Sequence, residues 1–445
     1  MDSTIPIFYK SYGQYVNSFR SFPREIDGLK PVERRLLLTA HLVARDSFVK
    51  NARIEGTCMA KFHPHTGAYG TIVQLVDQGF LDGQGNLGFK FGVEPIGAAA
   101  SRYTECKISE NVENLAFKYI NHVDFVKSEL DDEPTHLPTM FPFCLMGKEI
   151  TQGIGFGFRT VIPCYTIEDL HKRLIWLVKK DTDRPTIKPI TNCIIDSSDT
   201  VLEELLTTGK AKVDIHGVLI SNRALCKAIV KSWPPGRRFE AILNKFKEET
   251  DNKDIGYMDL STEKKENGEG GTNIVFTVLK QRNRDLIFDN FIKKLTKELK
   301  GSISFEIILS PINEEGIIRD SVDNMLLKTY NSFMKTNERM LNYEINKTAS
   351  IIDELTNLAK IKEPLAIVLQ SGPITKDNIS QKIEEVSRLS GVESNNVKEL
   401  MMKYHIHKLF TINTDASSVK QKHEEFKASL ADIENFVLNQ YNKIK

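Results

Sequence analysis

The chain has 445 residues, of which 40% are hydrophobic and 27% are charged, and its formal net charge is only +1. The length allows roughly two to four domains with ordinary globular cores, and the neutral balance means that a polyanion would have to be bound by a local cluster of basic side chains. The chain contains no apolar run of the roughly 18 residues that a transmembrane helix needs, and its first residues lack the basic and apolar regions of a signal peptide.

Residues 1–140 form a first region, in which helices and loops are expected. Residues 30–46 read KPVERRLLLTAHLVARD, where the proline suits a first helical turn and apolar residues recur on one face, so we predict a helix. Residues 65–79 predict a second helix that ends at Gly79. The glycine-rich segment 81–92 predicts a loop or a hairpin.

Residues 141–320 form a second region, in which strand-like segments alternate with helical ones. The strand-like segments include TNIVFTVLK at 272–280 and SISFEIILS at 302–310. The polar segment 261–271 contains several glycines and predicts a surface connection. We therefore expect both strands and helices in this region.

Residues 321–445 form a third, helical region with two heptad-like stretches. The spacing alternates between four and three residues in both, as in a coiled coil. The positions are Leu341, Ile345, Thr348, Ile352, Leu355 and Ala359, and then Phe426, Leu430, Ile433, Val437, Gln440 and Ile444. The simplest geometry is an antiparallel two-helix stalk within one chain, with residues 394–410 as a helical tip.

The predicted tip carries more apolar side chains than a segment exposed at the end of a stalk should tolerate. They are Met401, Met402, Tyr404, Ile406 and Leu409. A cluster of exposed apolar residues marks a surface that binds a partner. By symmetry, we expect that partner to be the same tip on a second copy of the chain.

The segment AAASRYTE, residues 98–105, places small residues directly before Arg102 and Tyr103. A phenol has a pKa of about 10, so it needs a base, a cation or a metal to act as a nucleophile on phosphorus. Arg102 is always charged and can hold phosphate oxygens with two parallel hydrogen bonds. Tyr103 is therefore a candidate nucleophile. The alternative is a tyrosine packed on the surface without a chemical role.

A locally basic stretch precedes this segment in an otherwise neutral chain. Its cations are Arg20, Arg24, Lys30, Arg34 and Arg35. Such a stretch suits a surface that follows the phosphates of a nucleic acid. The alternative is a solvated face of a helix, which is the usual meaning of a run of charges.

Two histidines flank a proline at the start of the second predicted helix. His63 and His65 could donate hydrogen bonds to a phosphate, because the amino-terminal end of a helix favours anions. Metal binding and simple helix capping are the alternatives. A spacing of two residues without a third ligand nearby makes a zinc site a poor interpretation.

Four segments in this order resemble the breakage-reunion region of type IIA DNA topoisomerases. They are DGLKPVERR, HPHTGAYGTIVQL, LDGQGNLG and AAASRYTE. The resemblance implies an α+β multidomain fold with a winged-helix DNA-binding domain at 1–140 and an α/β tower domain at 141–320. Residues 321–445 would then form a long antiparallel coiled-coil stalk with a helical dimerisation tip.

The resemblance also implies roles for single residues. Tyr103 matches the tyrosine that becomes joined to a 5′-phosphate, and Arg102 matches the arginine that stabilises the transition state. Ile154 matches an isoleucine that wedges between base pairs and bends the DNA. The residues expected to contact the DNA backbone are Arg20, Lys30, Arg34, Arg35, His63 and His65.

The chain resembles one subunit of such an enzyme, because the motifs for ATP binding and for metal binding are missing from it. It contains neither a G-x-x-x-x-G-K-[ST] loop nor the gyrase-type ATP-binding motifs, and it lacks the acidic metal-binding motifs of the family. We therefore expect a homodimer on double-stranded DNA, with ATP and most of the Mg²⁺ coordination supplied by partner subunits and no metal site in this chain.

In size, the chain most resembles the medium subunit of T-even-type phage topoisomerases. Its six scattered cysteines contain no C-x-x-C pair and indicate reduced thiols. Together with the missing membrane and secretion signals, this favours the cytoplasm, or the host cytoplasm for a viral chain.

The sequence therefore predicts the cleavage-and-religation subunit of an ATP-dependent type IIA topoisomerase. One alternative is a DNA-binding module without catalysis, which would not need Arg102 and Tyr103. Another is a tyrosine recombinase, which would join DNA through a 3′-phosphate without a metal. A purely structural coiled-coil scaffold is disfavoured by the glycine-rich and histidine motifs.

Overall fold

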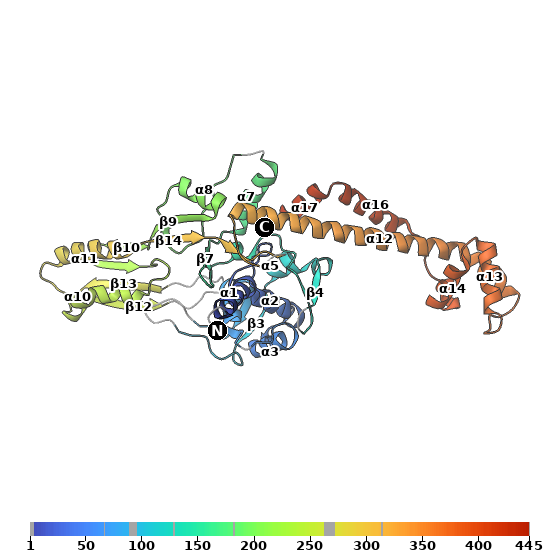
Figure 1. The fold of residues 1–445 in the computed structure, drawn as a ribbon, viewed down its shortest axis with the longest axis horizontal. Coiled ribbons are helices and arrows are strands. Elements are labelled where there is room, and N and C mark those ends of the chain that lie inside the picture. Colours follow the sequence, from blue (N-terminus) through green and yellow to red (C-terminus); the bar gives the residue numbers. More distant parts are fainter. Residues whose placement is uncertain are drawn as a thin grey trace. The chain divides into compact units, whose positions relative to one another are not determined.

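The computed structural model describes residues 4–65, 67–88, 96–127, 130–180, 183–261, 272–312 and 315–444. The chain forms two compact units, which divide between residues 333 and 334. Antiparallel sheets combine with helices, and one helix, α12 (Val322–Gln370), is 49 residues long (Figure 1). The predicted α+β multidomain class is confirmed, whereas the division at residues 140 and 320 stays a prediction. None of the helices within the described ranges is long and apolar enough to cross a membrane.

The first unit begins with short helices around a small sheet. The elements are α1 (Thr4–Val16), η1 (Asn17–Ser21), α2 (Pro31–Val43), β1 (Val49–Lys50), α3 (Asn51–Lys61), α4 (Tyr69–Asp77), β2 (Leu81–Gln84), β3 (Glu105–Ile108), α5 (Glu110–Val112), η2 (Glu113–Phe117), η3 (Ile120–His122), β4 (Phe125–Lys127), β5 (Asp132–Pro134) and α6 (Phe143–Met146). The sheet has the order β1-β3-β2, so β3 is its central strand. Leu36 of α2, Ile54 of α3 and Ile72 of α4 are fully buried in one core with Cys106 of β3.

Both helices predicted in this part are present. Helix α2 begins at Pro31 as predicted, and Glu33 accepts a 2.8 Å hydrogen bond from the backbone N–H of Lys30, which caps the first turn. Helix α4 is shorter than the predicted 65–79. It ends just before Gly79, whose φ of +80° allows the chain to turn away.

The rest of the first unit holds two larger sheets and the start of α12. The elements are β6 (Thr151–Ile154), β7 (Arg159–Ile162), α7 (Ile167–Lys179), β8 (Ile194–Ile195), α8 (Asp199–Thr208), β9 (Lys210–His216), β10 (Leu219–Asn222), β11 (Lys227–Val230), α9 (Phe239–Leu243), η4 (Asn244–Phe246), α10 (Lys247–Asp251), β12 (Ile255–Ser261), β13 (Thr272–Val278), α11 (Arg284–Glu298), β14 (Lys300–Glu306), β15 (Ile308–Leu309) and β16 (Ile318–Arg319). The sheets have the orders β6-β7-β14-β9-β8 and β10-β11-β13-β12.

The two strands predicted in the second region are confirmed as β13 and β14. Each lies between two neighbouring strands of its sheet, and Phe276 and Phe305 on them are buried. Strand β13 buries Ile274, Val275, Phe276 and Val278. Strand β14 alternates, with Ser302 and Ser304 exposed and Phe305 buried, as in an antiparallel strand with one face toward solvent.

Two predicted connections fall partly outside the described residues. The segment 81–92, predicted to be a loop or a hairpin, opens as strand β2, which pairs antiparallel with the next strand β3, and its residues 89–92 lie outside the described ranges. In the segment 261–271, Ser261 ends strand β12, and the remaining residues lie outside those ranges as well.

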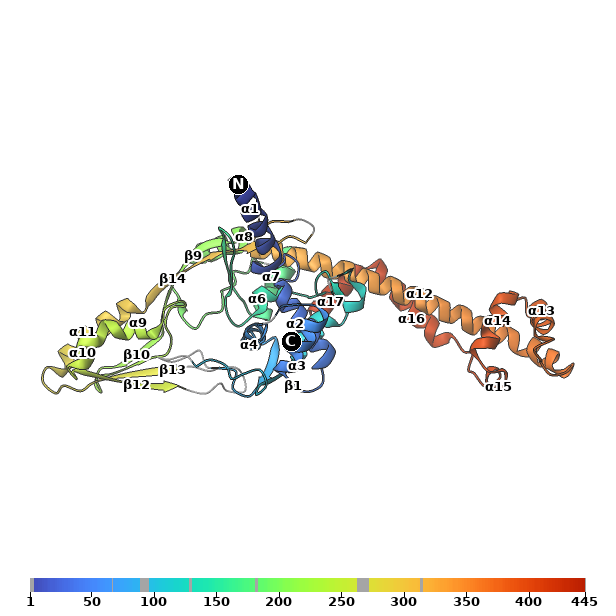
Figure 2. The ribbon, with the colours of Figure 1, turned by 60° about the horizontal axis from the view of Figure 1, so that its bottom comes forward.

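The second unit consists of the greater part of α12 and the helices that follow it. They are α13 (Ile379–Ser390), α14 (Ser394–Lys403), α15 (Ile406–Leu409), α16 (Ser417–Ala431) and α17 (Ile433–Tyr441). Figures 1 and 2 both show α16 and α17 running back along α12.

The predicted pairing of the two heptad stretches within one chain is confirmed. Thr348 on α12 lies 2.8 Å from the imidazole of His423 on α16, and Gln440 on α17 donates a 2.7 Å hydrogen bond to Asn337 on α12. The residue numbers rise on one helix as they fall on the other, so the helices are antiparallel. The second stretch is not one helix, because the backbone leaves the helical conformation at Asp432 (φ −126°, ψ 56°).

Two details of the stalk prediction need correction. Ala359 is exposed, and the neighbouring Leu358 is buried in its place. At this level α12 packs against the helices of the tip, so Leu358 joins a cluster with Ile361, Val386 and Val397. Leu409 is also fully buried in this cluster and is not one of the exposed residues of the tip.

Candidate functional site

The candidate nucleophile Tyr103 lies in the turn that leads into the central strand β3. Its side chain is 64% exposed, and the guanidinium carbon of Arg102 lies 4.6 Å from the centre of its ring. The backbone N–H of Tyr103 donates a 2.8 Å hydrogen bond to the carbonyl of Ala100, which closes the turn. A cation at this distance is attracted by the face of the ring, and the pair stands together on an accessible surface.

The turn is held on one side by the start of helix α3. The N–H of Asn51 donates to the carbonyl of Thr104 at 3.0 Å, and the N–H of Ala52 donates to the carbonyl of Ser101 at 3.2 Å. The amide of Asn51 also donates to the hydroxyl of Thr104 at 2.9 Å. The first N–H groups of a helix have no partner within the helix, so α3 uses two of them to fix the loop on both sides of Tyr103.

Gly85 supports the same turn through its lack of a side chain. Its φ is +92°, and a Cβ atom at this position would lie 3.1 Å from the carbonyl oxygen of Tyr103. The positive φ and the close approach both favour glycine. The second glycine of LDGQGNLG therefore allows the end of β2 to lie against the candidate nucleophile.

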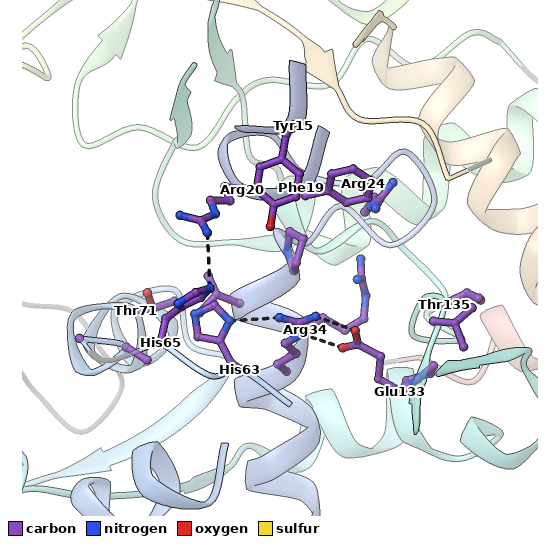
Figure 3. A pocket seen from close by; sticks show the side chains of 17 residues that line it. Tyr15, Phe19, Arg20, Arg24, Arg34, His63, His65, Thr71, Glu133 and Thr135 are labelled. Atoms are coloured by element: carbon purple, nitrogen blue, oxygen red, sulfur yellow. Dashed lines mark hydrogen bonds and ion pairs between the residues drawn. The ribbon is translucent and has the colours of Figure 1, made fainter. Parts of the chain in front are cut away.

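A separate pocket of about 530 Å³ gathers much of the predicted basic surface (Figure 3). Its charged and imidazole side chains are Arg20, Arg24, Arg34, Arg35, His63, His65 and Glu133. They come from η1 and the segment after it, from α2, from the segment before α4 and from β5. Arg34 and Arg35 are each paired with a carboxylate, Asp27 and Glu133, so the positive charges of Arg20 and Arg24 make the pocket suitable for an anion such as a phosphate group.

Arg35 is the centre of a hydrogen-bonded chain across this pocket. It donates to both carboxylate oxygens of Glu133 at 2.7 Å, and its remaining NH group lies 3.1 Å from Nδ1 of His63. At the pocket's other edge, Arg20 lies 3.4 Å from Nε2 of His65. In Figure 3, dashed lines mark the contact of Arg20 with His65 and, separately, the bonds that reach His63 and Glu133.

The environment of His63 disfavours its protonated form. Burial together with the positive charges of Arg35 and Arg20 and the neighbouring His65 lowers the pKa of His63 to about 4, although Glu133 acts in the opposite direction. His63 is therefore neutral at pH 7, and it can offer a phosphate a hydrogen-bond donor but no positive charge.

Arg34 does not fit the prediction that it contacts DNA. Its guanidinium is buried and binds both oxygens of the fully buried Asp27, at 2.6 and 3.0 Å. Asp27 also accepts hydrogen bonds from the backbone N–H groups of Leu29 and Leu137. Removing Arg34 from this pair would leave a buried carboxylate without its partner charge, so Arg34 holds the fold and is not assigned to DNA.

The remaining predicted site residues lie apart from the pocket. Lys30 donates a 2.8 Å hydrogen bond from Nζ to the carbonyl of Gln152 on β6. Ile154, at the end of the same strand, is 76% exposed. The turn that follows it is fixed by Asn17, whose side chain bonds both the N–H and the carbonyl of Phe156. Ile154 is thus an apolar side chain that projects from a supported hairpin.

Sequence reasoning missed Glu133 and Tyr69. Glu133 lies 98 positions from Arg35 in an acidic segment that gave no sign of a partner. Tyr69 donates a 2.6 Å hydrogen bond to the carbonyl of Ala99 and contacts the hydroxyl of Thr104 at 2.8 Å. The tyrosine in HPHTGAYG carried no local signal for this contact, because both of its partners lie in a segment that is distant along the chain.

The side chains that could ligate a metal ion are scattered. The described part of the chain contains no group of three or more histidine, cysteine, aspartate or glutamate side chains that could hold one. The six cysteines are buried thiols, and burial raises the pKa of Cys58 to about 11 and that of Cys106 to about 12. The described residues therefore do not form a group that fits a Mg²⁺ site.

Similarity to known proteins extends over nearly the whole chain. Residues 20–445 match the family of the A subunits of DNA gyrase and topoisomerase IV. The A subunit of DNA topoisomerase 4 from Neisseria gonorrhoeae is 26% identical over 89% of this chain and 56% of its own length. The A subunit of DNA gyrase from Campylobacter fetus is 27% identical over 92% of this chain and 47% of its own length.

The match covers most of this chain but only about half of each relative, so the chain spans about half the length of these curated relatives. On this chain, the matched region includes the turn of Tyr103 and all of the charged and imidazole residues of the pocket around Arg35. The chain therefore belongs to the family formed by the A subunits of DNA gyrase and topoisomerase IV.

Proposed function

We propose that this chain cleaves and rejoins DNA as part of an ATP-dependent type IIA topoisomerase. The observation that carries the proposal is the exposed Tyr103 with Arg102 against its ring, on a turn fixed from two sides, in a chain of this family. The match to curated relatives across most of the chain supports it further.

In the proposed reaction, the phenol oxygen of Tyr103 attacks a phosphorus atom of the DNA backbone. The phenol loses its proton to solvent as a bond forms between its oxygen and phosphorus. The bond from phosphorus to the 3′-oxygen breaks, and this oxygen takes up a proton from solvent, so the 3′-hydroxyl leaves and a 5′-phosphotyrosine remains. The guanidinium of Arg102 stabilises the charge that develops on the phosphate oxygens. The ester conserves the bond energy, so the 3′-hydroxyl can attack it and restore the strand without ATP.

The pocket of Figure 3 is proposed to bind the DNA backbone near the cleaved bond. Arg20 and His65 are exposed at its edge, and His63 contributes a neutral donor. Lys30 already bonds the carbonyl of Gln152, and Arg35 already bonds Glu133. Both would therefore contact DNA from the positions in which these hydrogen bonds hold them. Ile154 is proposed to enter a base step, where the cost of unstacking is offset by the larger contact of bent DNA with the protein.

We further propose the identity of each domain and the place of the dimer contact. Helices α2 to α4 with the sheet β1-β3-β2 form a winged-helix DNA-binding domain, and the two larger sheets belong to a tower domain. The paired helices of the second unit form a coiled-coil stalk, and its tip is a dimer contact between two copies of the chain. The nearer resemblance to a phage medium subunit stays a prediction.

Other subunits are proposed to bind ATP and most of the Mg²⁺. Since the described residues do not fit a metal site, no step of the reaction is assigned to a metal held by this chain. Purified alone, the chain should bind a DNA duplex but hydrolyse no ATP. ATP-dependent relaxation of plasmid by the pure single chain would contradict this division of labour.

The proposal is tested with Tyr103→Phe, which removes one oxygen and keeps the ring. Wild type and variant are combined with the partner subunits, Mg²⁺ and supercoiled plasmid and are then denatured with detergent. We expect the wild type to give linear DNA joined to protein at the 5′ end and the variant to give none, while its DNA affinity stays within a few-fold. The matched control is Tyr257→Phe, since Tyr257 is an exposed tyrosine on β12 and its variant should cleave like the wild type.

Two outcomes would contradict the proposal. DNA joined through a 3′-phosphate would indicate a tyrosine recombinase. Tight DNA binding without any covalent adduct in the wild type, in the presence of all subunits, would indicate a binding module without catalysis.

A further inference from the structure

The carboxylate of Glu133 occupies a pocket that otherwise suits an anion. It is largely buried, and both of its oxygens accept hydrogen bonds from Arg35 at 2.7 Å. Two parallel hydrogen bonds fix the plane of a guanidinium as well as its position. Arg35 is therefore held in one orientation by a residue of the hairpin β4–β5.

This orientation determines what Arg35 does to His63. The third bond of Arg35 runs from its NH1 group to Nδ1 of His63 at 3.1 Å. An arginine can only donate hydrogen bonds, so Nδ1 must accept and cannot carry a proton. A neutral imidazole carries its single proton on the other nitrogen, which here is Nε2.

We propose that Glu133 is a positioning residue, which aligns Arg35 so that Arg35 holds His63 as a neutral imidazole with its proton on Nε2. His63 then presents a donor on the ring edge that faces away from Arg35, in the pocket proposed for a DNA phosphate. The consequence for DNA rests on the proposed function, whereas the state of the imidazole does not. The charged and titratable groups around His63 are Arg35 of α2, Arg20 of η1, Glu133 of β5 and His65.

The state of His63 can be measured in the full chain by NMR with ¹⁵N-labelled histidine, with its signal assigned by His63→Gln. At pH 7 we expect the wild type to show a single neutral tautomer with the proton on Nε2. On acidification this form should persist to about pH 4, because burial and the positive neighbours lower the pKa of His63 to about 4. A wild-type His63 that carries its proton on Nδ1, or that is protonated at pH 7, would overturn the inference.

The role of Glu133 is tested with Glu133→Gln against Asp131→Asn. Asp131 lies on the same hairpin and bonds Lys61 at 3.1 Å, so both variants remove one negative charge from the same element. Only Glu133→Gln loses the paired bonds to Arg35, and we expect only this variant to lose the single Nε2–H tautomer. An unchanged His63 signal in a folded Glu133→Gln chain would overturn the positioning role. The wild-type measurement does not depend on Glu133→Gln, so it decides the tautomer even if that variant does not fold.

Function gives a second and independent test. Removing a negative charge near bound phosphates should not weaken binding, so both variants should bind a DNA duplex at least as tightly as the wild type. Cleavage in the complete enzyme should fall about tenfold in Glu133→Gln, as for the loss of one positioned hydrogen bond, and should not fall in Asp131→Asn. Equal cleavage rates in the two variants would overturn the positioning role. A wild type that does not cleave would count against the proposed function, and the tautomer would still be decided by NMR.

Discussion

Tyr69 and Thr104 are joined by a hydrogen bond of 2.8 Å between their hydroxyl groups. The hydroxyl of Tyr69 also donates to the carbonyl of Ala99 at 2.6 Å. Since a hydroxyl has one proton, Thr104 must donate to Tyr69, and Thr104 in turn accepts from the amide of Asn51 at 2.9 Å. The hydrogen bonds therefore run in one direction, from Asn51 to Thr104, from Thr104 to Tyr69 and from Tyr69 to Ala99. They link α3 and α4 to Thr104, the residue after Tyr103.

The first prediction concerns this chain of hydrogen bonds. Tyr69→Phe keeps the ring and removes the central hydroxyl, so we expect a loss of about 1 kcal/mol in the free energy of unfolding. Cleavage in the complete enzyme should fall by more than DNA affinity does, because the loop of Tyr103 is less well positioned. Thr104→Val should behave like Tyr69→Phe, and Thr104→Ser, which keeps the hydroxyl, should behave like the wild type. Equal cleavage by the valine and serine variants would refute the role of the hydroxyl.

The second prediction concerns Ile154 as a wedge. Ile154→Ala should leave the fold intact, because the side chain is 76% exposed, and should reduce the bending of a bound duplex. The bend can be followed by energy transfer between dyes at the two duplex ends. Ile220→Ala removes another exposed isoleucine, from strand β10, and should bend DNA like the wild type. An Ile154→Ala protein that bends DNA fully would show that the wedge is not needed.

The third prediction compares two arginines that share their partners. Arg173 and Arg184 both bond Glu203 and both stack on Trp176, but only Arg173 is fully buried, where it also binds Asp323 at the start of α12. Arg173→Met leaves two acids without their buried partner and should lower the free energy of unfolding by about 3–5 kcal/mol. Arg184→Met should cost about 0–1 kcal/mol, as is usual for an exposed pair. Urea denaturation of the two variants would measure this difference, and similar losses would contradict it.

The fourth prediction concerns the tip of the second unit. Met402 is 75% exposed, whereas Leu409 is fully buried. Met402→Glu should therefore weaken dimerisation of the isolated chain in analytical ultracentrifugation without changing its circular dichroism. Leu409→Glu places a charge in the apolar cluster and should reduce the helical signal itself.

Ile351→Glu is the matched control for the tip. Ile351 is an exposed isoleucine on α12 outside the tip cluster, so a charge there should leave both readouts unchanged. If Met402→Glu remains as tightly dimeric as the wild type, the tip is not the dimer contact.

The local patterns of the sequence were sufficient for features that depend on neighbours along the chain. Pro31 and the apolar repeat after it predicted α2, because the start and the buried face of a helix are set by residues within one or two turns. The heptad spacing likewise identified the apolar faces of α12, α16 and α17, while their antiparallel pairing joins residues that are 75 and 103 positions apart. The motif AAASRYTE predicted a candidate nucleophile, which the structure places on an exposed turn.

Only the tertiary structure decided which basic and apolar residues are available for function. Arg34 and Arg35 are adjacent and identical in type, yet Arg34 is buried against Asp27 and Arg35 faces the pocket with Glu133. Met402 and Leu409 are both apolar, and the packing of the tip buries Leu409 while Met402 stays exposed. A side chain's charge and hydrophobicity are properties of the sequence, but its partner and its exposure depend on contacts between distant segments, which local spacing does not encode.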